Sequence, residues 1–307
     1  MIAMLKQFRY NQLQSFLSWC LRTYHGRVIA IGLIAGLVYM PTYVSVLIQG
    51  ILAGRSTIVL NLGFLGLGLE RLWRHREEIA ATKVWPDDRA IGLCLILGGA
   101  LWLPFSLHSV SLQAFLWMLV LIGMAWSSFT PQLFGRFPLA SAFILVSMYP
   151  NHAWLSNQIF RALTGAYLLE NLMAWLGSVA LRLMGYAAET QGRFLSLPEG
   201  AVEVGSGCTG FDMAVVLAGV SIIWGLFIKA NRQRIAIAMV SGIAIALALN
   251  IPRIVLLAFA AVYWGQDSFD FWHGFWGGQI FAAIMFTAYY YAAMAIYSPA
   301  QKAIIKR

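Results

Sequence analysis

The sequence predicts an all-α integral membrane protein, a polytopic helical bundle with about eight transmembrane helices. Of its 307 residues, 60% are apolar and only 11% are charged, whereas soluble domains are about 45–50% apolar and about 25% charged. Eight crossings of about 20 residues each need roughly 160 residues, which is about half of the chain. A mean hydropathy of +0.73 leaves no room for a large soluble domain.

Eight apolar segments are each long enough, or nearly long enough, to cross a bilayer. They cover approximately residues 28–53, 57–73, 90–107, 111–130, 137–150, 209–228, 235–262 and 274–297. The fifth segment is short, and we expect it to cross only with help from its neighbours. No cleavable signal peptide precedes the first segment, which we interpret as a retained span.

Basic residues between these segments orient the chain. They form four clusters. Lys6, Arg9, Arg22 and Arg27 precede the first segment, and Arg71, Arg74, Arg76, Lys83 and Arg89 lie between the second and third. Lys229, Arg232 and Arg234 lie between the sixth and seventh, and Lys302, Lys306 and Arg307 are at the end of the chain. Basic flanks remain in the cytoplasm, so both termini are predicted to be cytoplasmic. The same rule accounts for the net charge of +9 without nucleic-acid binding.

We therefore predict one membrane domain over residues 1–307 in the cytoplasmic (inner) membrane. Its parts are a cytoplasmic N-terminal segment (1–27), N-terminal spans (28–150), an external segment (151–207), C-terminal spans (208–297) and a cytoplasmic tail (298–307). The orientation requires an even number of crossings within the external segment. Arg161 and Glu170 interrupt its helical pattern, which favours an amphipathic segment at the outer surface, although two crossings remain an alternative.

A glycine-rich turn, Gly205-Ser-Gly-Cys-Thr-Gly210, opens the sixth apolar segment. It matches the GxGxxG dinucleotide pattern, but a membrane-length apolar helix follows and no acidic residue lies about 20 residues on to hold a ribose. Cys208 begins this helix, where unpaired N–H groups and the helix dipole favour a thiolate. Gly207 and Gly210 permit close approach of a substrate and expose N–H donors toward an oxyanion.

The other cysteines have no comparable surroundings. Cys20 and Cys94 are interpreted as small buried residues, which is also the alternative interpretation of Cys208. Three cysteines do not form a disulfide framework.

Two further polar residues are predicted at the outer face. Arg253 lies roughly 27 Å along the seventh segment from its cytoplasmic end, and an arginine within a membrane is a candidate functional residue. Asn250 shares its helix face and is placed to position the guanidinium. The alternative is that Arg253 only extends toward the external headgroups.

His273 opens the eighth segment and is also predicted outside. A cysteine, an arginine and a histidine from three different spans therefore meet at one membrane face. A thiolate, a histidine that exchanges protons and a cationic donor are the groups that acyl transfer requires.

These residues resemble the exosortase/archaeosortase family of integral-membrane, cysteine-dependent sorting enzymes. The resemblance rests on Gly207-Cys208-Thr209-Gly210, on Asn250-x-x-Arg253 and on His273, with about 45 and then 20 residues between them. Thr209 stands where many members carry serine. The sequence from Val202 onward most resembles the cyanobacterial branch, the cyanoexosortases. The N-terminal spans agree only in number and hydropathy.

The resemblance implies a protease-transpeptidase whose substrates are exported proteins with a C-terminal sorting signal: a Pro-Glu-Pro-like motif, a transmembrane helix and a basic tail. Cleavage at the external, periplasmic side leaves a thioester on Cys208 that an acceptor nucleophile resolves. By the same resemblance, His273 transfers protons and Arg253 binds or polarises the reacting group, with their roles partly exchangeable. No cofactor and no metal is implied.

Two other classes of function remain as alternatives. A multi-spanning transporter would account for the spans and the membrane arginine, but it usually has inverted repeats or paired broken helices, and the sequence has neither. A non-catalytic envelope scaffold is the second alternative. A metal enzyme and a serine hydrolase are disfavoured, because no ligand pair and no Gly-x-Ser-x-Gly motif is present. The sorting motif, the acceptor and the oligomeric state are left open, and the expected surroundings are membrane lipid.

Overall fold

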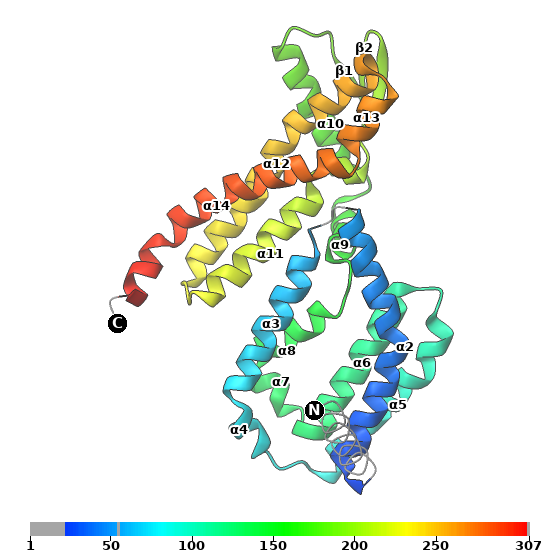
Figure 1. The fold of residues 1–307 in the computed structure, drawn as a ribbon, viewed down its shortest axis with the longest axis vertical. Helices are drawn as coiled ribbons and strands as arrows, with labels where there is room; N and C mark the ends of the chain where they lie inside the picture. Colours follow the sequence, from blue (N-terminus) through cyan, green and yellow to red (C-terminus); the bar gives the residue numbers. More distant parts are fainter. Residues whose placement is uncertain (1–21, 54–55, 306–307) are drawn as a thin grey trace, which may run out of the picture. The chain divides into compact units, whose positions relative to one another are not determined.

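The computed structural model describes residues 22–53 and 56–305, and Figure 1 shows them as a predominantly helical chain. Two compact units are present: Met1–Val46 with Phe64–Pro150, and Leu47–Gly63 with Asn151–Arg307. Cys20, most of the predicted cytoplasmic segment 1–27 and residues 306–307 of the predicted tail lie outside the described residues.

Each of the eight apolar segments contains a helix. In order these helices are α2 (Tyr24–Leu52), α3 (Ile58–Arg74), α5 (Pro86–Trp102) continued by η1 (Leu103–Ser106), α6 (Val110–Phe129), α8 (Pro138–Ser147), α11 (Phe211–Phe227), α12 (Arg232–Phe259) continued by η3 (Ala260–Trp264), and α14 (Phe275–Ile305). Short helices α4 (Arg76–Ala80), α7 (Gln132–Arg136) and α13 (Gln266–His273) connect some of them.

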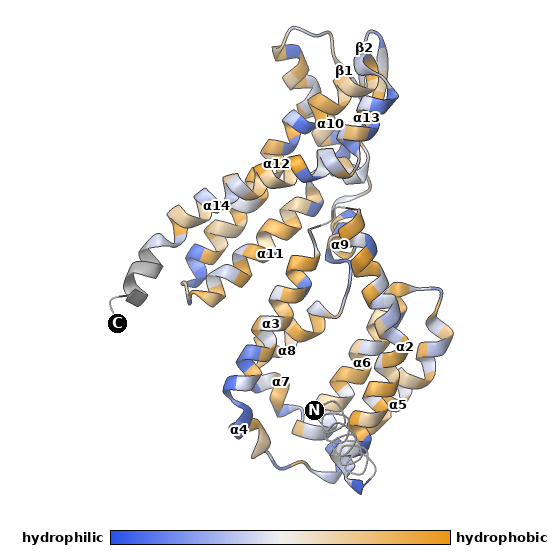
Figure 2. Ribbon diagram, viewed as in Figure 1, coloured by the Kyte–Doolittle hydropathy of each residue, from blue (hydrophilic) through white to orange (hydrophobic). Residues whose placement is uncertain are grey.

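Within the described residues, five of these helices are long and apolar enough to cross a membrane: α2, α5 with η1, α6, α12 with η3, and α14. The shorter α8 and α11 are also apolar, and the hydrophobic colouring of the helices is visible in Figure 2. The helical membrane bundle is thus confirmed. The number of eight crossings stays a prediction.

Small residues and tyrosine hydroxyls organise the first unit. A Cβ atom built on Gly92 of α5 would lie 2.7 Å from the Gly123 carbonyl oxygen of α6, so the two helices cross at backbone distance and only glycine fits. Tyr39 of α2 donates a hydrogen bond to the Met148 carbonyl at 2.6 Å. The buried hydroxyl is satisfied, as a polar group in an apolar interior must be.

The second unit contains α11, α12 and α14, which lie side by side (Figure 1). Tyr297 donates to the Ser221 carbonyl at 2.8 Å, and the Tyr289 and Ser221 hydroxyls are 2.6 Å apart. These buried bonds tie α14 to α11. In a membrane interior no water is available to bond the hydroxyls, so they bond to a neighbouring helix instead.

Residues 151–207 fold onto the second unit as α9 (His152–Thr164), α10 (Leu168–Leu183) and a three-stranded antiparallel sheet. The strands are β1 (Glu189–Gln191), β2 (Phe194–Leu197) and β3 (Gly200–Glu203), with Thr190 opposite Leu195 and Leu195 opposite Val202. Helix α10 buries Met173, Ala174 and Leu181 in the same apolar cluster as residues of α12. The small sheet was not expected, because strands of three or four residues carry too little alternation to be seen in a sequence.

Neither α9 nor α10 is among the five long apolar helices. The amphipathic character and the external location of residues 151–207 stay predictions. Helix α12 is long: its 28 residues extend about 42 Å at 1.5 Å per residue, beyond a hydrocarbon core of about 30 Å. Its last turns pack on α10 and η3.

Candidate functional site

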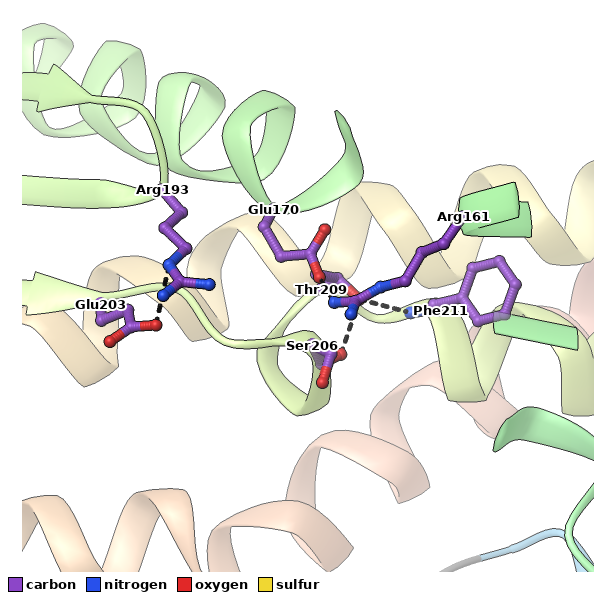
Figure 3. A network of polar contacts seen from close by, with 7 residues as sticks. All are labelled: Arg161, Glu170, Arg193, Glu203, Ser206, Thr209 and Phe211. Carbon is purple, nitrogen blue, oxygen red and sulfur yellow. Dashed lines mark hydrogen bonds and ion pairs between the residues drawn. The ribbon is translucent and has the colours of Figure 1, made fainter. Parts of the chain in front are cut away.

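Cys208 lies in a tight turn between the sheet and the membrane helix α11. The chain leaves β3 and makes the 3-10 turn η2 (Ser206–Cys208); α11 begins at Phe211. Thr209 closes the turn, since its hydroxyl donates to the Ser206 carbonyl at 2.9 Å and accepts from the Phe211 N–H at 3.3 Å (Figure 3). Cys208 therefore precedes the helix and does not occupy its first turn.

Gly210 and Asn250 hold this turn against α12. Gly210 has a φ of +77°, a conformation that favours glycine. A Cβ atom added there would lie 2.9 Å from the Asn250 Cβ atom. Asn250 is fully buried and donates from Nδ2 to the Cys208 carbonyl at 2.6 Å. The Cys208 backbone is thus fixed by a side chain 42 residues away in sequence.

The Cys208 side chain is buried, with 8% of its surface exposed. It lines a small apolar pocket with Val202, Val204, Ile254 and Phe269, among others. Burial raises the pKa of the Cys208 thiol, and the Arg253 guanidinium and a backbone hydrogen bond at Gly205 oppose that rise. The expectation of a lowered pKa at a helix N-terminus does not hold here, because loss of solvent outweighs both.

Arg253 lies one helical turn beyond Asn250 on α12 and is only partly exposed. Its Nε atom is buried without a hydrogen-bond partner in the part of the chain that the structure describes, and the same holds for the Asn250 Oδ1 atom. The positive charge of the Arg253 guanidinium acts on Cys208, since it lowers the pKa of the thiol against the larger effect of burial. The structure therefore links both Asn250 and Arg253 to Cys208, the first by a hydrogen bond and the second by its charge.

His273 is exposed and ends α13 instead of opening the last span, because α14 begins after Gly274. Its ring stacks on Phe269, with ring centroids 5.1 Å apart and 11° between the planes. Phe269 lines the Cys208 pocket. Among the described residues no hydrogen bond joins His273 to Cys208, and the histidine touches a residue that lines the pocket instead.

The interpretation of Cys94 as a buried residue is wrong. Cys94 is free and exposed, whereas Cys208 is free and buried. An exposed cysteine on a long apolar helix is expected where lipid surrounds the protein, and the sequence pattern of α5 does not tell which of its faces is covered.

A network of ion pairs next to the Cys208 turn was not identified from the sequence (Figure 3). Arg161 of α9 pairs with Glu170 of α10, whose side chain is 4% exposed. Arg193 pairs with Glu203 of β3 at 2.9 Å. Both arginines also lie over the Tyr167 ring, at 5.4 and 4.4 Å from its centroid.

The network holds α9, α10 and the sheet together beside the turn. Phe160, next to Arg161, contacts the Phe211 ring at the start of α11, with centroids 5.4 Å apart. The sequence showed Arg161 and Glu170 only as polar interruptions of a helical pattern. No local signal pairs them, since they lie on different helices.

A comparison with models of known protein families identifies the family of this chain. The model of the transmembrane exosortase family matches residues 52–290, well over half of the chain. The chain belongs to the transmembrane exosortase family. The matched range contains Cys208, Asn250, Arg253 and His273. A search of curated proteins and a search of solved structures found no match. The likeness to the cyanobacterial branch stays a prediction.

No group of three His, Cys, Asp or Glu side chains in the described part of this exosortase is arranged to hold a metal ion. The candidate site consists of the Cys208 thiol, the Asn250 amide and the Arg253 guanidinium. A thiol can attack a carbonyl carbon, and an amide or a guanidinium can donate hydrogen bonds to the carbonyl oxygen.

Proposed function

We propose that this chain is a membrane-embedded cysteine protease-transpeptidase. It cleaves the C-terminal sorting signals of exported proteins at the outer face of the cytoplasmic membrane. The substrates carry a Pro-Glu-Pro-like motif followed by a transmembrane helix and a basic tail. Membership of the exosortase family and the surroundings of Cys208 support this function.

The observation that carries the proposal is a pair of buried polar atoms beside the cysteine. Asn250 Oδ1 accepts hydrogen bonds and Arg253 Nε donates them, and both are buried without partners among the described residues. Such atoms cost free energy until a partner arrives. A peptide group offers one N–H and one C=O, so an extended substrate that displaced the side chains covering these atoms would satisfy both.

The proposed reaction has two covalent steps. His273 takes the proton of the Cys208 thiol, and Sγ attacks the scissile carbonyl carbon while Arg253 stabilises the oxyanion. The C–N bond breaks, the departing amine takes the proton from His273, and a thioester remains on Cys208. An acceptor nucleophile (water, lipid or glycan) then gives its proton to His273 and attacks the thioester. The C–S bond breaks, and the proton returns to the thiol.

The raised pKa of Cys208 gives this scheme a specific requirement. The thiol is protonated in the free protein, so a base must act when the substrate is bound. Because His273 lies one turn after Phe269 on the same face of α13, roughly 6 Å along the helix axis, a shift of α13 along its axis would bring the imidazole to the pocket. Substrate binding supplies that movement in the proposed reaction.

The length of α12 supports the proposed outer location of the site. Arg253 follows Arg232 by 21 positions, or about 32 Å of helix, which matches the thickness of the hydrocarbon core. With Arg232 in the cytoplasm, Arg253 and the Cys208 turn stand at the opposite boundary. The transmembrane helix of a substrate would lie beside α11 or α12 and present its preceding motif to Cys208.

The test uses membranes that carry the full chain and a tagged substrate with a C-terminal sorting signal. Cys208→Ser and Cys208→Ala are expected to stop conversion of precursor to product at unchanged protein levels, and Cys94→Ser is the matched control with normal conversion. Added hydroxylamine is expected to cleave the thioester and leave a hydroxamate on the substrate. Normal conversion by Cys208→Ala would overturn the proposal, and a transporter or a scaffold would tolerate that change.

A further inference from the structure

An apolar cavity of about 950 Å³ lies within the unit that contains α5–α8. Its wall is formed mainly by aliphatic and aromatic side chains of α2, α6, α7 and α8, including Ile29, Leu121, Met124, Leu133, Ile144 and Leu145. A second cavity of about 660 Å³ shares Leu72, Ala80, Phe129 and Leu133 with the first. The volumes are those of sites for whole organic molecules.

The cavity is long in the direction of the helices. Along α6 the lining residues run from Leu121 to Phe129, a rise of roughly 12 Å. At the Phe129 end lies the loop between α4 and α5, which contributes Thr82, Lys83 and Val84. The space therefore has an apolar interior and one polar end, the shape that an acyl chain with a headgroup requires.

Two cations line the polar end, Lys83 in the loop and Arg89 in the first turn of α5. In the described residues neither has a carboxylate within salt-bridge distance. Arg89 instead lies 4.9 Å from the centroid of the Tyr24 ring. The neighbouring carboxylate of Asp88 accepts a hydrogen bond from Trp126 Nε1 at 3.1 Å.

Several other basic residues of the same region are paired with carboxylates. Arg74 pairs with Glu70, and Arg136 pairs with Glu78. Lys83 and Arg89 differ from these paired residues in having no carboxylate within salt-bridge distance in the described chain.

One residue that lines the cavity carries a buried polar atom. Ser141 of α8 lines the cavity and is 9% exposed, and its Oγ atom has no hydrogen-bond partner in the described residues. A hydroxyl in an apolar wall needs an acceptor. The ester carbonyl next to a phosphate headgroup is such an acceptor.

We propose that this cavity binds an anionic phospholipid of the cytoplasmic leaflet. The acyl chain fills the apolar interior, the phosphate lies at Lys83 and Arg89, and Ser141 Oγ donates to an ester oxygen. The basic loop is predicted to be cytoplasmic, where anionic lipids attract juxtamembrane cations. A free phosphate ion would satisfy the two cations and leave the apolar volume without an occupant.

The experiment measures lipid binding to the full chain, purified in an uncharged detergent. Native mass spectrometry counts the dioleoyl phosphatidylglycerol or phosphatidylcholine molecules that remain bound, and lipid titration gives the affinities. We expect the wild type to prefer phosphatidylglycerol. Lys83→Gln with Arg89→Gln is expected to weaken its binding by about 25-fold, at about fivefold per lost charge. Arg74→Gln with Arg136→Gln removes two paired charges and is expected to keep the preference.

A second variant tests the apolar part. Ser128→Phe places a ring in the cavity and is expected to reduce the binding of both lipids while both cations remain. Glycerol phosphate is expected not to compete with phosphatidylglycerol. Equal retention of the two lipids, unchanged binding in the Lys83/Arg89 variant, or full competition by glycerol phosphate would each overturn the proposal.

Discussion

The Asn250 side chain donates a hydrogen bond to the Cys208 backbone carbonyl at 2.6 Å, although 42 residues separate the two. The bond joins the membrane helix α12 to the turn that carries the proposed nucleophile. Asn250 is fully buried and Gly210 packs directly against it. The position of the cysteine is therefore set by α12, the same helix that carries Arg253.

Asn250→Ala is expected to lower both stability and activity. Without Nδ2 the Cys208 carbonyl loses its donor inside the protein, and an unsatisfied buried carbonyl costs about 1–3 kcal/mol. Asn250→Leu keeps a similar size and has no donor at all, so it is expected to be no better. The unfolding midpoint, followed by tryptophan fluorescence in detergent, measures the loss of stability. A wild-type midpoint in Asn250→Leu would show that the bond contributes nothing.

Gly210→Ala is expected to destabilise the protein by about 2–4 kcal/mol, because the positive φ strains alanine and the new Cβ overlaps Asn250. Gly205→Ala is the matched control, since Gly205 has a φ of −76° and nothing within 4 Å of an added Cβ. Chemical denaturation of both variants compares the two costs. Equal costs would mean that the contact between Gly210 and Asn250 is not specific.

The membrane class and the helices could be predicted from the sequence, because long apolar runs between basic loops are typical of membrane spans and rare in soluble proteins. Counting residues along the helices also predicted Cys208, Asn250 and Arg253 at one face, and the structure joins Asn250 to Cys208. The contact between Asn250 and the Cys208 carbonyl was not predictable, since it depends on the path of a turn.

Burial explains why the pKa of the Cys208 thiol is raised and not lowered as the sequence predicted. The prediction considered only the dipole of the following helix, whereas the pKa also depends on the apolar side chains that enclose the thiol. The pairing of Arg161 with Glu170 depends in turn on the angle between two helices. Neither the burial of the thiol nor the angle between the two helices can be read from a local pattern of residues.

The raised pKa of Cys208 predicts slow alkylation at neutral pH in the absence of substrate. The folded state holds the thiol proton more tightly than the unfolded chain does. This stabilising contribution is fully present below the ordinary thiol pKa of about 8.5 and is lost as the pH rises through the raised folded pKa. In a variant with Cys20 and Cys94 replaced by serine, the iodoacetamide rate measured between pH 7 and 10 is expected to rise later than for a small-molecule thiol. A rate that saturates below pH 8 would contradict the raised pKa.

The proposed orientation predicts which loops a reagent reaches from outside. A cysteine placed at Ser268 on α13 is expected to react with a membrane-impermeant maleimide in intact cells, whereas one placed at Asn231 before α12 is expected to react only after permeabilisation. Both experiments start from the variant without Cys20 and Cys94. Labelling of both positions from the same side would refute the orientation, and with it the outer location of the site.

Arg253→Lys separates the two interpretations of this arginine. If the side chain only extends to the headgroups, lysine replaces it, because lysine carries the same charge to the same depth. If the guanidinium stabilises an oxyanion, lysine fails, because it lacks the planar fork of donors. We expect Arg253→Lys to insert normally and to lose about 10²–10³ in the rate of substrate cleavage, the cost of one lost oxyanion donor.

Arg232→Lys, at the opposite end of α12, is the matched control and is expected to process substrate normally. The measurement is the ratio of precursor to cleaved substrate over time, in membranes with equal amounts of each variant. Because Arg253 Nε is buried without a partner in the described structure, wild-type cleavage by Arg253→Lys would leave that atom without a role in the reaction.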